Sequence, residues 1–461
     1  MSVTKEYFDS LRSCKVAVIG MGVSNTPLIR MLLREGIKVT VCDRSPREKL
    51  EEQAAELESL GAGLRLGEDY LDKIHKYDVI FRTPGLSPNT PQLKKAVEKG
   101  CELTSEMEVF FSLCPCPIIA VTGSDGKTTT TTLIAEFLRE AGHTVFVGGN
   151  IGKPLLPDVD GMTPQDLVVV ELSSFQLMTM ERSPRVAVFT NLSPNHLDYH
   201  HTMEEYTRAK MNIYWHQSPQ DRVIFNADND VTRSLSKNAP GAVTLFSRLR
   251  SLDEGVYLRD DTIWLTNSMG SREVLPLSMI RLPGVHNVEN YMAAIAAVDG
   301  LVPDKCVRAV AQRFTGVEHR MELVREVDGV RWFNDSIGSS PSRTIAGLRS
   351  FDKKVILIAG GYDKHIPFDE LGEEIVKRVK CLVLTGDTSS KIRSAVEQAS
   401  GYAPDRLPIR EADDLSAAVV LAAQAADEGD TVVLSPACAA FDRFKNFMER
   451  GNAFKSIVNR L

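Results

Sequence analysis

The stretch that decides the fold of this 461-residue chain is Pro117-Ile118-Ile119-Ala120-Val121-Thr122-Gly123-Ser124-Asp125-Gly126-Lys127-Thr128-Thr129. The apolar run from Ile118 to Val121 predicts a buried strand, a glycine-rich turn follows it, and Thr129 to Arg139 predicts a helix. In such an arrangement, backbone N–H groups at the start of the helix point at a bound anion, and the helix dipole favours negative charge there. The stretch therefore predicts a phosphate-binding loop.

The residue types in this loop fit a nucleoside triphosphate. Lys127 is placed to reach the β- and γ-phosphates, and the Thr128 hydroxyl to bind Mg²⁺. Val121 stands where the strict GxxxxGK[ST] pattern has its first glycine, so a Gly-Lys turn that merely caps a helix stays an alternative. The threonine run after Lys127 disfavours that alternative, because β-branched residues are mediocre helix formers whose hydroxyls suit a ligand better. We predict ATP contacts along the whole loop, at Gly123, Ser124, Asp125, Gly126, Lys127, Thr128 and Thr129.

Length and composition bound the class of protein. A chain of 461 residues suggests three domains at about 150 residues each, and we place them at 1–105, 106–313 and 314–461. A net charge of −7 disfavours nucleic-acid binding, which needs a basic surface. The eight cysteines are scattered without CxxC spacing, which favours reduced thiols. No signal-peptide core and no apolar run of about 18 residues is present, so we expect a soluble cytoplasmic protein without membrane insertion.

The first domain contains a second glycine-rich loop. Residues 15–20 and 38–43 predict two parallel strands around a helix, and between them lies Gly20-Met21-Gly22-Val23-Ser24-Asn25. The loop begins like a dinucleotide fingerprint, and Asp43 ends the second strand where a ribose-binding acid would be, but Asn25 replaces the third glycine. Three alternatives remain: a nicotinamide cofactor, another nucleotide or its diphosphate, or a plain βαβ turn. A further strand, 78–81, ends in a second candidate turn, Thr83-Pro84-Gly85.

Polar residues also follow the predicted strands of the central domain. The strand 167–171 ends in Glu171, which suits Mg²⁺ because this cation prefers carboxylate oxygens, although the carboxylate could instead cap a helix. His196 follows the strand 186–190, and Lys210 lies in the middle of a helix predicted over 206–215. Asn287 and Asn290 share one helix face at i, i+3, where they suit an adenine or ribose, or simply cap the helix.

From about residue 314 the alternation of strands and helices restarts. Strands are predicted at 330–334, 355–359, 382–385 and 431–435, with helices at 341–348, 371–379, 391–399 and 415–426. The predicted fold class is α/β with three domains: a Rossmann-like N-terminal domain, a central P-loop ATPase-type domain with a parallel sheet, and a Rossmann-like C-terminal domain. This organisation predicts an ATP-dependent enzyme that joins two substrates.

The sequence resembles the Mur ligases over essentially its whole length. The motifs that carry the resemblance are VTGSDGKTT, GGNIG, ELSSFQL, NLSPNHLDYH, GVHNVENYMAA, GVEHRMELV, NDS, GGYDK and SPACAAFDRFKNFMERG. The resemblance implies an ATP-dependent ligase of peptidoglycan synthesis that adds D-glutamate to UDP-N-acetylmuramoyl-L-alanine. The reaction would pass through an acyl phosphate. The enzyme is expected to be a monomer.

The resemblance also implies roles for individual residues. The catalytic residues would be Lys127, Glu171, His196 and Lys210. Two Mg²⁺ ions would be held by Thr128 and Glu171 and by His196 and a carbamylated Lys210. Further ATP contacts would come from Asn287, Asn290, Arg320 and Asp335. The UDP-linked substrate would be held by Ser24, Asp43, Thr83, Pro84, Gly85, Asn150, Ser173, Gln176 and His196.

Two positions depart from the family. Ile337 stands where a lysine usually follows NDS, and Ala440 stands where SPACAS has its serine. Both positions normally help to receive the carboxylates of the incoming amino acid. We therefore predict a rearranged amino-acid site built from Ser339, Lys364, Phe441 and Phe447, with Ser336, Ser340, Arg343 and His365 as further polar groups.

Three other functions remain as alternatives. A dehydrogenase would need nicotinamide binding at the first loop, and a regulatory ATP-binding protein would need no second metal site. Folylpolyglutamate synthesis, which shares the phosphate loop, does not account for a first domain suited to uridine diphosphate.

Overall fold

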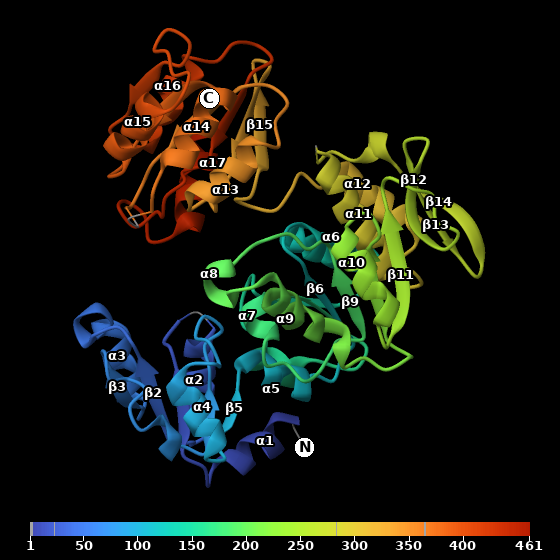
Figure 1. Ribbon diagram of the computed structural model, residues 1–461, viewed down its shortest axis with the longest axis vertical. Coiled ribbons are helices and arrows are strands. Elements are labelled where there is room, and N and C mark those ends of the chain that lie inside the picture. Colours follow the sequence, from blue (N-terminus) through green and yellow to red (C-terminus); the bar gives the residue numbers. More distant parts are fainter. Residues whose placement is uncertain (1–2, 23, 283, 364–365) are drawn as a thin grey trace. The chain divides into compact units, whose positions relative to one another are not determined.

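The computed structural model describes residues 3–22, 24–282, 284–363 and 366–461. It forms two compact units, Met1–Arg313 and Phe314–Leu461, each built around parallel sheets (Figure 1). The first unit holds a five-stranded and a nine-stranded sheet, and the second holds a six-stranded sheet. Three sheets with helices between their strands confirm the predicted α/β class, while the boundary proposed after residue 105 stays a prediction.

The N-terminal sheet is wholly parallel, in the order β3-β2-β1-β4-β5. Its strands are β1 (Val16–Ile19), β2 (Val39–Asp43), β3 (Gly63–Leu66), β4 (Val79–Phe81) and β5 (Glu102–Thr104). Its helices are α1 (Val3–Leu11), α2 (Asn25–Arg34), α3 (Glu51–Ser59), α4 (Pro91–Glu98) and α5 (Glu106–Leu113). The central strands β1 and β4 are buried along their whole length because helices cover both faces of the sheet.

The nine-stranded sheet has the order β14-β13-β12-β11-β10-β9-β6-β8-β7. Its strands are β6 (Ile118–Thr122), β7 (Val145–Gly149), β8 (Leu167–Glu171), β9 (Val186–Phe189), β10 (Arg222–Asn226), β11 (Ala242–Ser247), β12 (Gly255–Arg259), β13 (Thr262–Asn267) and β14 (Gly270–Pro276). The pairs β12–β13 and β13–β14 are antiparallel, so the sheet ends in an antiparallel extension (Figure 1). Strands β6, β8 and β9 are adjacent, so the residues after these three strands share one edge.

The helices of this part differ from the prediction mainly in where they begin. They are α6 (Lys127–Glu140), α7 (Ser174–Leu177), α8 (Leu197–His200), α9 (Met203–Trp215), α10 (Asp230–Leu235), α11 (Val285–Val298) and α12 (Asp304–Arg313). Helix α9 begins three residues before the predicted start, because the Thr202 hydroxyl accepts from the Glu205 N–H and caps it. Helix α11 begins at Val285, so Asn287 and Asn290 are both helical.

The second unit has the strand order β15-β16-β20-β17-β18-β19, parallel except for the pair β15–β16. Its strands are β15 (Glu322–Val327), β16 (Val330–Asn334), β17 (Val355–Ala359), β18 (Val379–Leu384), β19 (Ile409–Glu411) and β20 (Thr431–Leu434). Its helices are α13 (Pro341–Leu348), α14 (Asp369–Arg378), α15 (Ser389–Gln398), α16 (Leu415–Ala423) and α17 (Phe447–Val458). The strands and helices predicted here are confirmed to within a few residues; β15, β19 and α17 had not been predicted.

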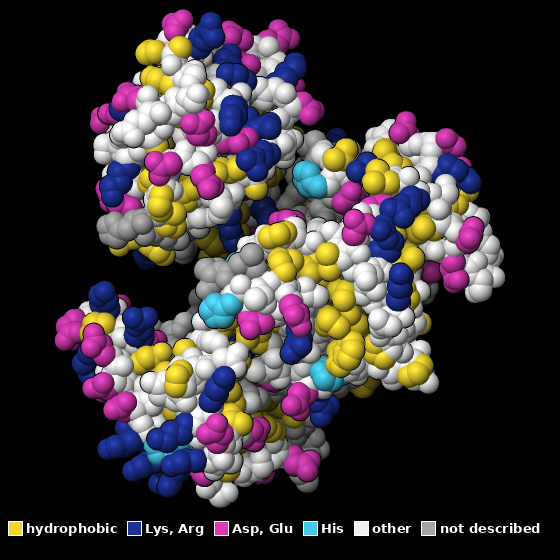
Figure 2. All heavy atoms as spheres, in the orientation of Figure 1, with side chains coloured by type: hydrophobic (Ala, Val, Ile, Leu, Met, Phe, Trp, Pro, Cys, Tyr) yellow, Lys and Arg dark blue, Asp and Glu magenta, His cyan; other side chains and the backbone are white. Residues whose placement is uncertain are grey.

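Acidic and basic side chains are mixed over the face shown in Figure 2. A basic cluster stands out at the lower left of that view. On the first domain, Lys76, Lys95 and Lys99 surround His75, and together with burial they lower the pKa of its ring. Across the described ranges, no helix combines the length and the apolarity that crossing a bilayer requires.

Candidate active site

The phosphate loop between β6 and α6 depends on two glycines. Gly123 and Gly126 have φ values of +149° and +77°, which L side chains rarely adopt. A Cβ atom would overlap the Thr190 hydroxyl at Gly123 and the Asn290 side-chain oxygen at Gly126. The loop can adopt this shape only with glycine at both positions, because there is no room for a side chain beside Thr190 or Asn290.

Residues that follow β9 hold this loop in place. The Asn191 side-chain oxygen accepts from the Asp125 N–H at 2.9 Å, and the Thr190 hydroxyl donates to the Asp125 carbonyl at 2.6 Å. The Ser124 hydroxyl donates to the Ser193 carbonyl at 2.9 Å. Hydrogen bonds on both sides of Asp125 leave the loop preorganised before any anion binds.

Lys127 is the first residue of α6. Its ammonium donates to the carbonyls of Gly123, at 3.0 Å, and Ser124, at 2.8 Å. These contacts bend the side chain back over the loop, so its charge lies beside the backbone that would surround a phosphate.

Thr128 and Glu171 are buried next to Lys127, and the exposed Asn150 joins them in a polar cluster. The Thr128 hydroxyl donates to Glu171 Oε2 at 2.7 Å, and the Asn150 amide donates to Glu171 Oε1 at 2.7 Å. Glu171 is 2% exposed and ends β8, as predicted. A hydroxyl and a carboxylate this close offer the hard oxygen ligands that Mg²⁺ prefers.

Lys210 is buried on α9, with a side chain only 1% exposed. Its Nζ atom donates to the Thr122 hydroxyl at 3.1 Å and to the Gly123 carbonyl at 2.9 Å, so it lies directly beneath the phosphate loop. Burial, reinforced by the nearby charge of Lys127, lowers the pKa of Lys210 well below its usual value. A neutral amine at this position is a nucleophile rather than a cation.

His196 lies in the segment after β9, with a φ of 54°. Its ring packs edge-on against Phe175, with centroids 5.0 Å apart, and near Tyr206 at 6.3 Å. The Tyr206 ring is also 5.0 Å from Lys210 Nζ, so one aromatic side chain contacts both residues of the predicted second metal site. In the part of the chain that the structure describes, no three His, Cys, Asp or Glu side chains gather as a metal-ion cluster.

Two predicted substrate contacts turn out to cap a helix. Ser173 and Gln176 form a capping box at the start of α7, in which the Ser173 hydroxyl accepts from Gln176 N–H and Gln176 Oε1 accepts from Ser173 N–H. The Ser-x-x-Gln spacing is the sequence signal for this arrangement and had been overlooked.

Asn287 and Asn290 share one face of α11, as their spacing predicted. Asn290 Nδ2 donates to Asn287 Oδ1 at 3.0 Å, and Asn290 Oδ1 accepts from the Thr130 hydroxyl at 3.3 Å. Asn290 therefore joins α11 to the helix of the phosphate loop.

The first-domain loop is organised around a carboxylate. Asp43 accepts from the backbone N–H groups of Met21, at 2.9 Å, and Ser45, at 2.8 Å. Ser24 occupies the N-cap position of α2, without a side-chain cap bond. A Cβ at Gly20 would lie 3.2 Å from the Thr83 Cβ, so the turn Thr83-Pro84-Gly85 adjoins this loop.

In the second unit, Asp335 follows β16 and is almost wholly buried. Its carboxylate accepts from the Ser435 hydroxyl at 2.7 Å and from the Met321 N–H at 3.3 Å. Burial raises the pKa of Asp335 to about 6, against the attraction of Arg320 and Arg343. Arg320 therefore lies close enough to Asp335 to influence its charge.

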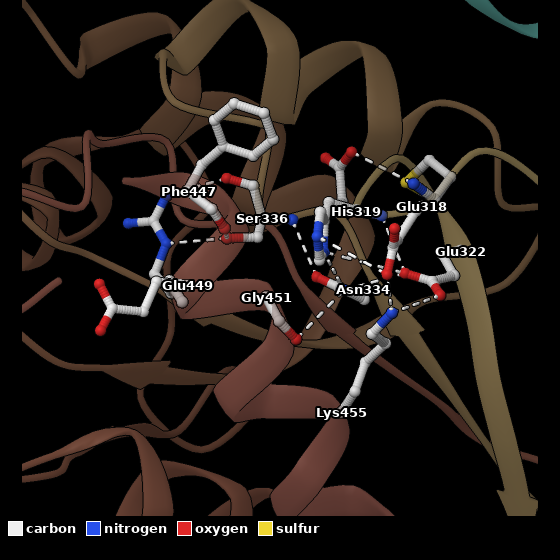
Figure 3. Close-up of polar contacts among 12 residues, drawn as sticks. Glu318, His319, Glu322, Asn334, Ser336, Phe447, Glu449, Gly451 and Lys455 are labelled. Carbon is white, nitrogen blue, oxygen red and sulfur yellow. Dashed lines mark hydrogen bonds and ion pairs between the residues drawn. The ribbon is translucent and has the colours of Figure 1, made fainter. Parts of the chain in front are cut away.

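A polar cluster surrounds His319 (Figure 3). Asn334 Nδ2 donates to His319 Nδ1 at 3.0 Å, and Glu322 Oε2 accepts from the Asn334 amide at 3.1 Å. Lys455 forms ion pairs with Glu318 and Glu322, on the side of the cluster away from Ser336 (Figure 3). Burial lowers the pKa of His319, which favours the neutral ring that this amide contact requires.

The residues predicted to bind an amino acid are only partly brought together. Phe441 is 62% exposed and packs edge-on against Tyr362, while Phe447 begins α17 and lies beside His319. Ser339 lies before α13, and Lys364 and His365 fall outside the described residues.

The Ser336 hydroxyl, expected to help at this site, is already engaged. It donates to the Phe447 carbonyl at 2.8 Å and accepts from Arg450 at 3.0 Å, and the residue has no exposed surface. In the structure this hydroxyl holds α17 in place, and its part in the amino-acid site stays a prediction.

Several residues that shape the site were not predicted from the sequence. Phe175 and Tyr206 are ordinary apolar positions in a sequence, and nothing in their spacing marks them. The sequence does carry a signal for Arg82 and Arg450. A charged side chain in or beside an apolar stretch is seldom buried without hydrogen-bond partners, so such an arginine indicates a structural contact.

Family models match the chain in three consecutive stretches. The Mur ligase MurD-like, N-terminal domain matches residues 14–105, the Mur ligase middle domain residues 121–298, and the Mur ligase, glutamate ligase domain residues 319–438.

Two relatives named UDP-N-acetylmuramoylalanine--D-glutamate ligase are similar over nearly the full length. The protein of Acetivibrio thermocellus is 52% identical over 99% of this chain and 98% of its own. That of Clostridium novyi is 50% identical over 99% of both chains. Among solved structures, UDP-N-acetylmuramate-alanine ligase from Thermotoga maritima matches with a TM-score of 0.57 at 18% identity, covering 97% of this chain and 99% of its own, and so shares the fold.

The chain belongs to the Mur ligase family. It is an ATP-dependent ligase of peptidoglycan-precursor synthesis, which confirms both the resemblance and the activity class expected from the sequence.

Proposed function

We propose that the chain joins D-glutamate to UDP-N-acetylmuramoyl-L-alanine, with ATP converted to ADP and phosphate. The names of the relatives at about half identity support this substrate pair. The observation that carries the proposal is the set of contacts around the phosphate loop: Lys127 and Lys210 both donate to the Gly123 carbonyl, and Thr128 donates to Glu171.

The reaction proceeds in two steps. A carboxylate oxygen of the alanyl group attacks the γ-phosphorus of ATP, ADP leaves, and an acyl phosphate forms. The amine of D-glutamate then attacks the acyl carbon, and the tetrahedral intermediate releases phosphate and a proton. Lys127 neutralises charge on the transferred phosphoryl group, because such transfer is accelerated mainly by positioning and electrostatics.

The residues fit two Mg²⁺ ions, which would neutralise phosphate charge. Thr128 and Glu171 would hold one ion, since their oxygens are already 2.7 Å apart. His196 and Lys210 would serve the other, with Lys210 as a carbamate. The lowered pKa of Lys210 supports this modification, because only a neutral amine can attack CO₂ and then lose a proton.

The nucleotide end of the substrate would be held in the first domain, by Ser24, Asp43 and the turn Thr83–Gly85. Asn150 and His196 would flank the muramoyl-alanine end, with Ser173 and Gln176 contributing through the shape of α7. The ATP nucleoside would contact Asn287, Asn290, Arg320 and Asp335.

D-glutamate would be received by Ser339, Phe441, Phe447 and Lys364, with Arg343 as a further cation. Ile337 and Ala440 offer no charge or hydroxyl, and an uncompensated buried carboxylate costs several kcal/mol. We also propose that the enzyme acts as a monomer in the cytoplasm, where ATP and UDP-linked precursors are made.

Phosphate release from ATP tests the proposal. UDP-N-acetylmuramoyl-L-alanine is combined in turn with D-glutamate, L-glutamate, D-aspartate and D-alanine, and the peptide products are identified by mass. We expect turnover with D-glutamate. Preference for D-alanine, or turnover with no muramoyl substrate present, would contradict the assignment.

A further inference from the structure

Arg82 is a buried arginine to which the function proposed above gives no role. It directly follows β4 and is 1% exposed. Its Nη1 atom donates to three carbonyls of the turn that comes next: Thr83 at 3.2 Å, Pro84 at 3.0 Å and Leu86 at 2.8 Å. The turn is thus wrapped around the guanidinium, and its shape depends on that group.

The other terminal nitrogen of Arg82 reaches the central domain. Nη2 donates to the Phe175 carbonyl at 3.1 Å and to the Thr179 hydroxyl at 3.2 Å. Glu108 lies beside this contact, and the nearby Arg82 charge partly offsets the burial that raises the pKa of Glu108 to about 7. One planar group therefore ties the turn after β4 to the segment that contains α7.

Phe175 extends this connection towards the site of chemistry. Its carbonyl accepts from Arg82, while its ring packs against His196 at 5.0 Å and stacks on His200 at 5.6 Å. A displacement of the Phe175 backbone would therefore shift the surface against which His196 rests.

We propose that Arg82 is a positioning residue for the UDP-linked substrate. It fixes the turn Thr83–Gly85 against the α7 segment. The distance between the turn, which would bind the nucleotide end of the substrate, and α7, which would lie at its acyl end, is thereby held constant. Lysine could replace it only in part, because a single ammonium lacks the two outward-facing nitrogens that contact the two sides. The inference rests on the proposed function, since both elements are proposed to contact that substrate.

Substitutions can separate the two halves of this bridge. Arg82→Met removes both, and we expect the KM for UDP-N-acetylmuramoyl-L-alanine to rise about tenfold or more while the KM for ATP stays unchanged. Arg82→Lys should restore part of the loss. Thr179→Val removes one acceptor on the α7 side alone, so the affinity for UDP itself, measured by calorimetry, should stay within about twofold while the KM for the full substrate rises about threefold.

Arg222→Met is the matched control. Arg222 is a half-buried arginine that donates to the Ala297 carbonyl at 2.8 Å, and its loss should affect thermal stability without changing the KM for either nucleotide. Equal KM changes for ATP and the UDP substrate in Arg82→Met, or no KM change in Arg82→Lys and Thr179→Val, would overturn the inference. If the unsubstituted enzyme itself bound no UDP, the proposed function would fail instead.

Discussion

Lys210 in the first unit and Arg450 in the second are both buried cations beside the ends of parallel strands, yet burial affects them differently. Lys210 has two acceptors, and its pKa falls well below its usual value. Arg450 donates to Ser336, Cys438 and Ala439 through four hydrogen bonds, and its pKa falls only to about 10.

The difference follows from the two functional groups. Guanidinium spreads its charge over a planar fork of donors, so carbonyls can replace its water and the proton stays. An ammonium is a strongly hydrated point charge that loses its proton when it is desolvated. Similar burial therefore leaves a charged structural clamp in one unit and favours the neutral form of the amine in the other.

Removing Lys127 should have the largest effect, because it affects both the phosphate site and Lys210. We expect Lys127→Ala to lower turnover by about 10³-fold or more, since transition-state charge loses its partner. Its loss should also raise the pKa of Lys210, because the Lys127 charge helps to lower it. Phosphate release at saturating ATP measures the first effect, with Lys354→Ala as an exposed control; near-normal release would refute the role.

The Lys210→Ala variant tests whether the buried amine is used as a carbamate. We expect a loss of about 10²–10³-fold in turnover, partly rescued by acetate, whose carboxylate can occupy the vacated space. Lys210→Arg should be equally inactive but not rescued, because guanidinium fills the space and keeps its charge. Mass spectrometry of peptides and activity in CO₂-depleted buffer provide the independent readouts. Full activity in either variant would exclude the modification.

Substituting Arg450 should reduce stability rather than chemistry. Arg450→Met leaves carbonyls and the Ser336 hydroxyl without a donor, and breaking a buried charged network costs about 3–5 kcal/mol. The urea midpoint of the second unit should fall accordingly, and Arg450→Lys should fall less. The exposed Arg460→Met is the control. An unchanged midpoint in Arg450→Met would mean that the clamp contributes nothing.

Substituting Asp335 should have the smallest effect. Asp335 is a buried acidic group, to be compared with the buried basic groups Lys210 and Arg450. Its pKa is raised to about 6, so the folded protein holds this proton more tightly than the unfolded chain. The stabilisation is complete below the unfolded pKa near 4 and is lost as pH rises through about 6, amounting to about 3 kcal/mol. Asp335→Asn should flatten the stability profile between pH 4 and 7. A profile unchanged by the substitution would argue against a raised pKa.

Local patterns predicted most strands and the phosphate loop, because both follow from short-range rules. The apolar run ending at Val121 became β6, and its missing glycine had no consequence, since Val121 pairs as a strand residue with Glu171 and Val188. Glu171 and Lys210 were proposed from the sequence, and both lie beside the loop.

Contacts between distant segments could not be predicted in this way. Nothing in the sequence around Arg82 indicates that its guanidinium donates to the Phe175 carbonyl. Nothing around Ser336 indicates that its hydroxyl donates to the carbonyl of Phe447, the first residue of α17. The capping box at Ser173 is different, because it follows from the local Ser-x-x-Gln spacing and could have been predicted.

The close approach of Gly126 to Asn290 has a consequence for how this sequence can change over time. The two residues are 164 positions apart by number, yet any side chain at the loop glycine would collide with the amide on α11. A larger residue at 126 would need Asn290 to be shortened first, and it would still have to adopt a φ of +77°, which L side chains rarely do. Shortening Asn290 in turn removes the hydrogen bond from Thr130. Each single step is disfavoured, and the pair is expected to persist as a unit through sequence drift.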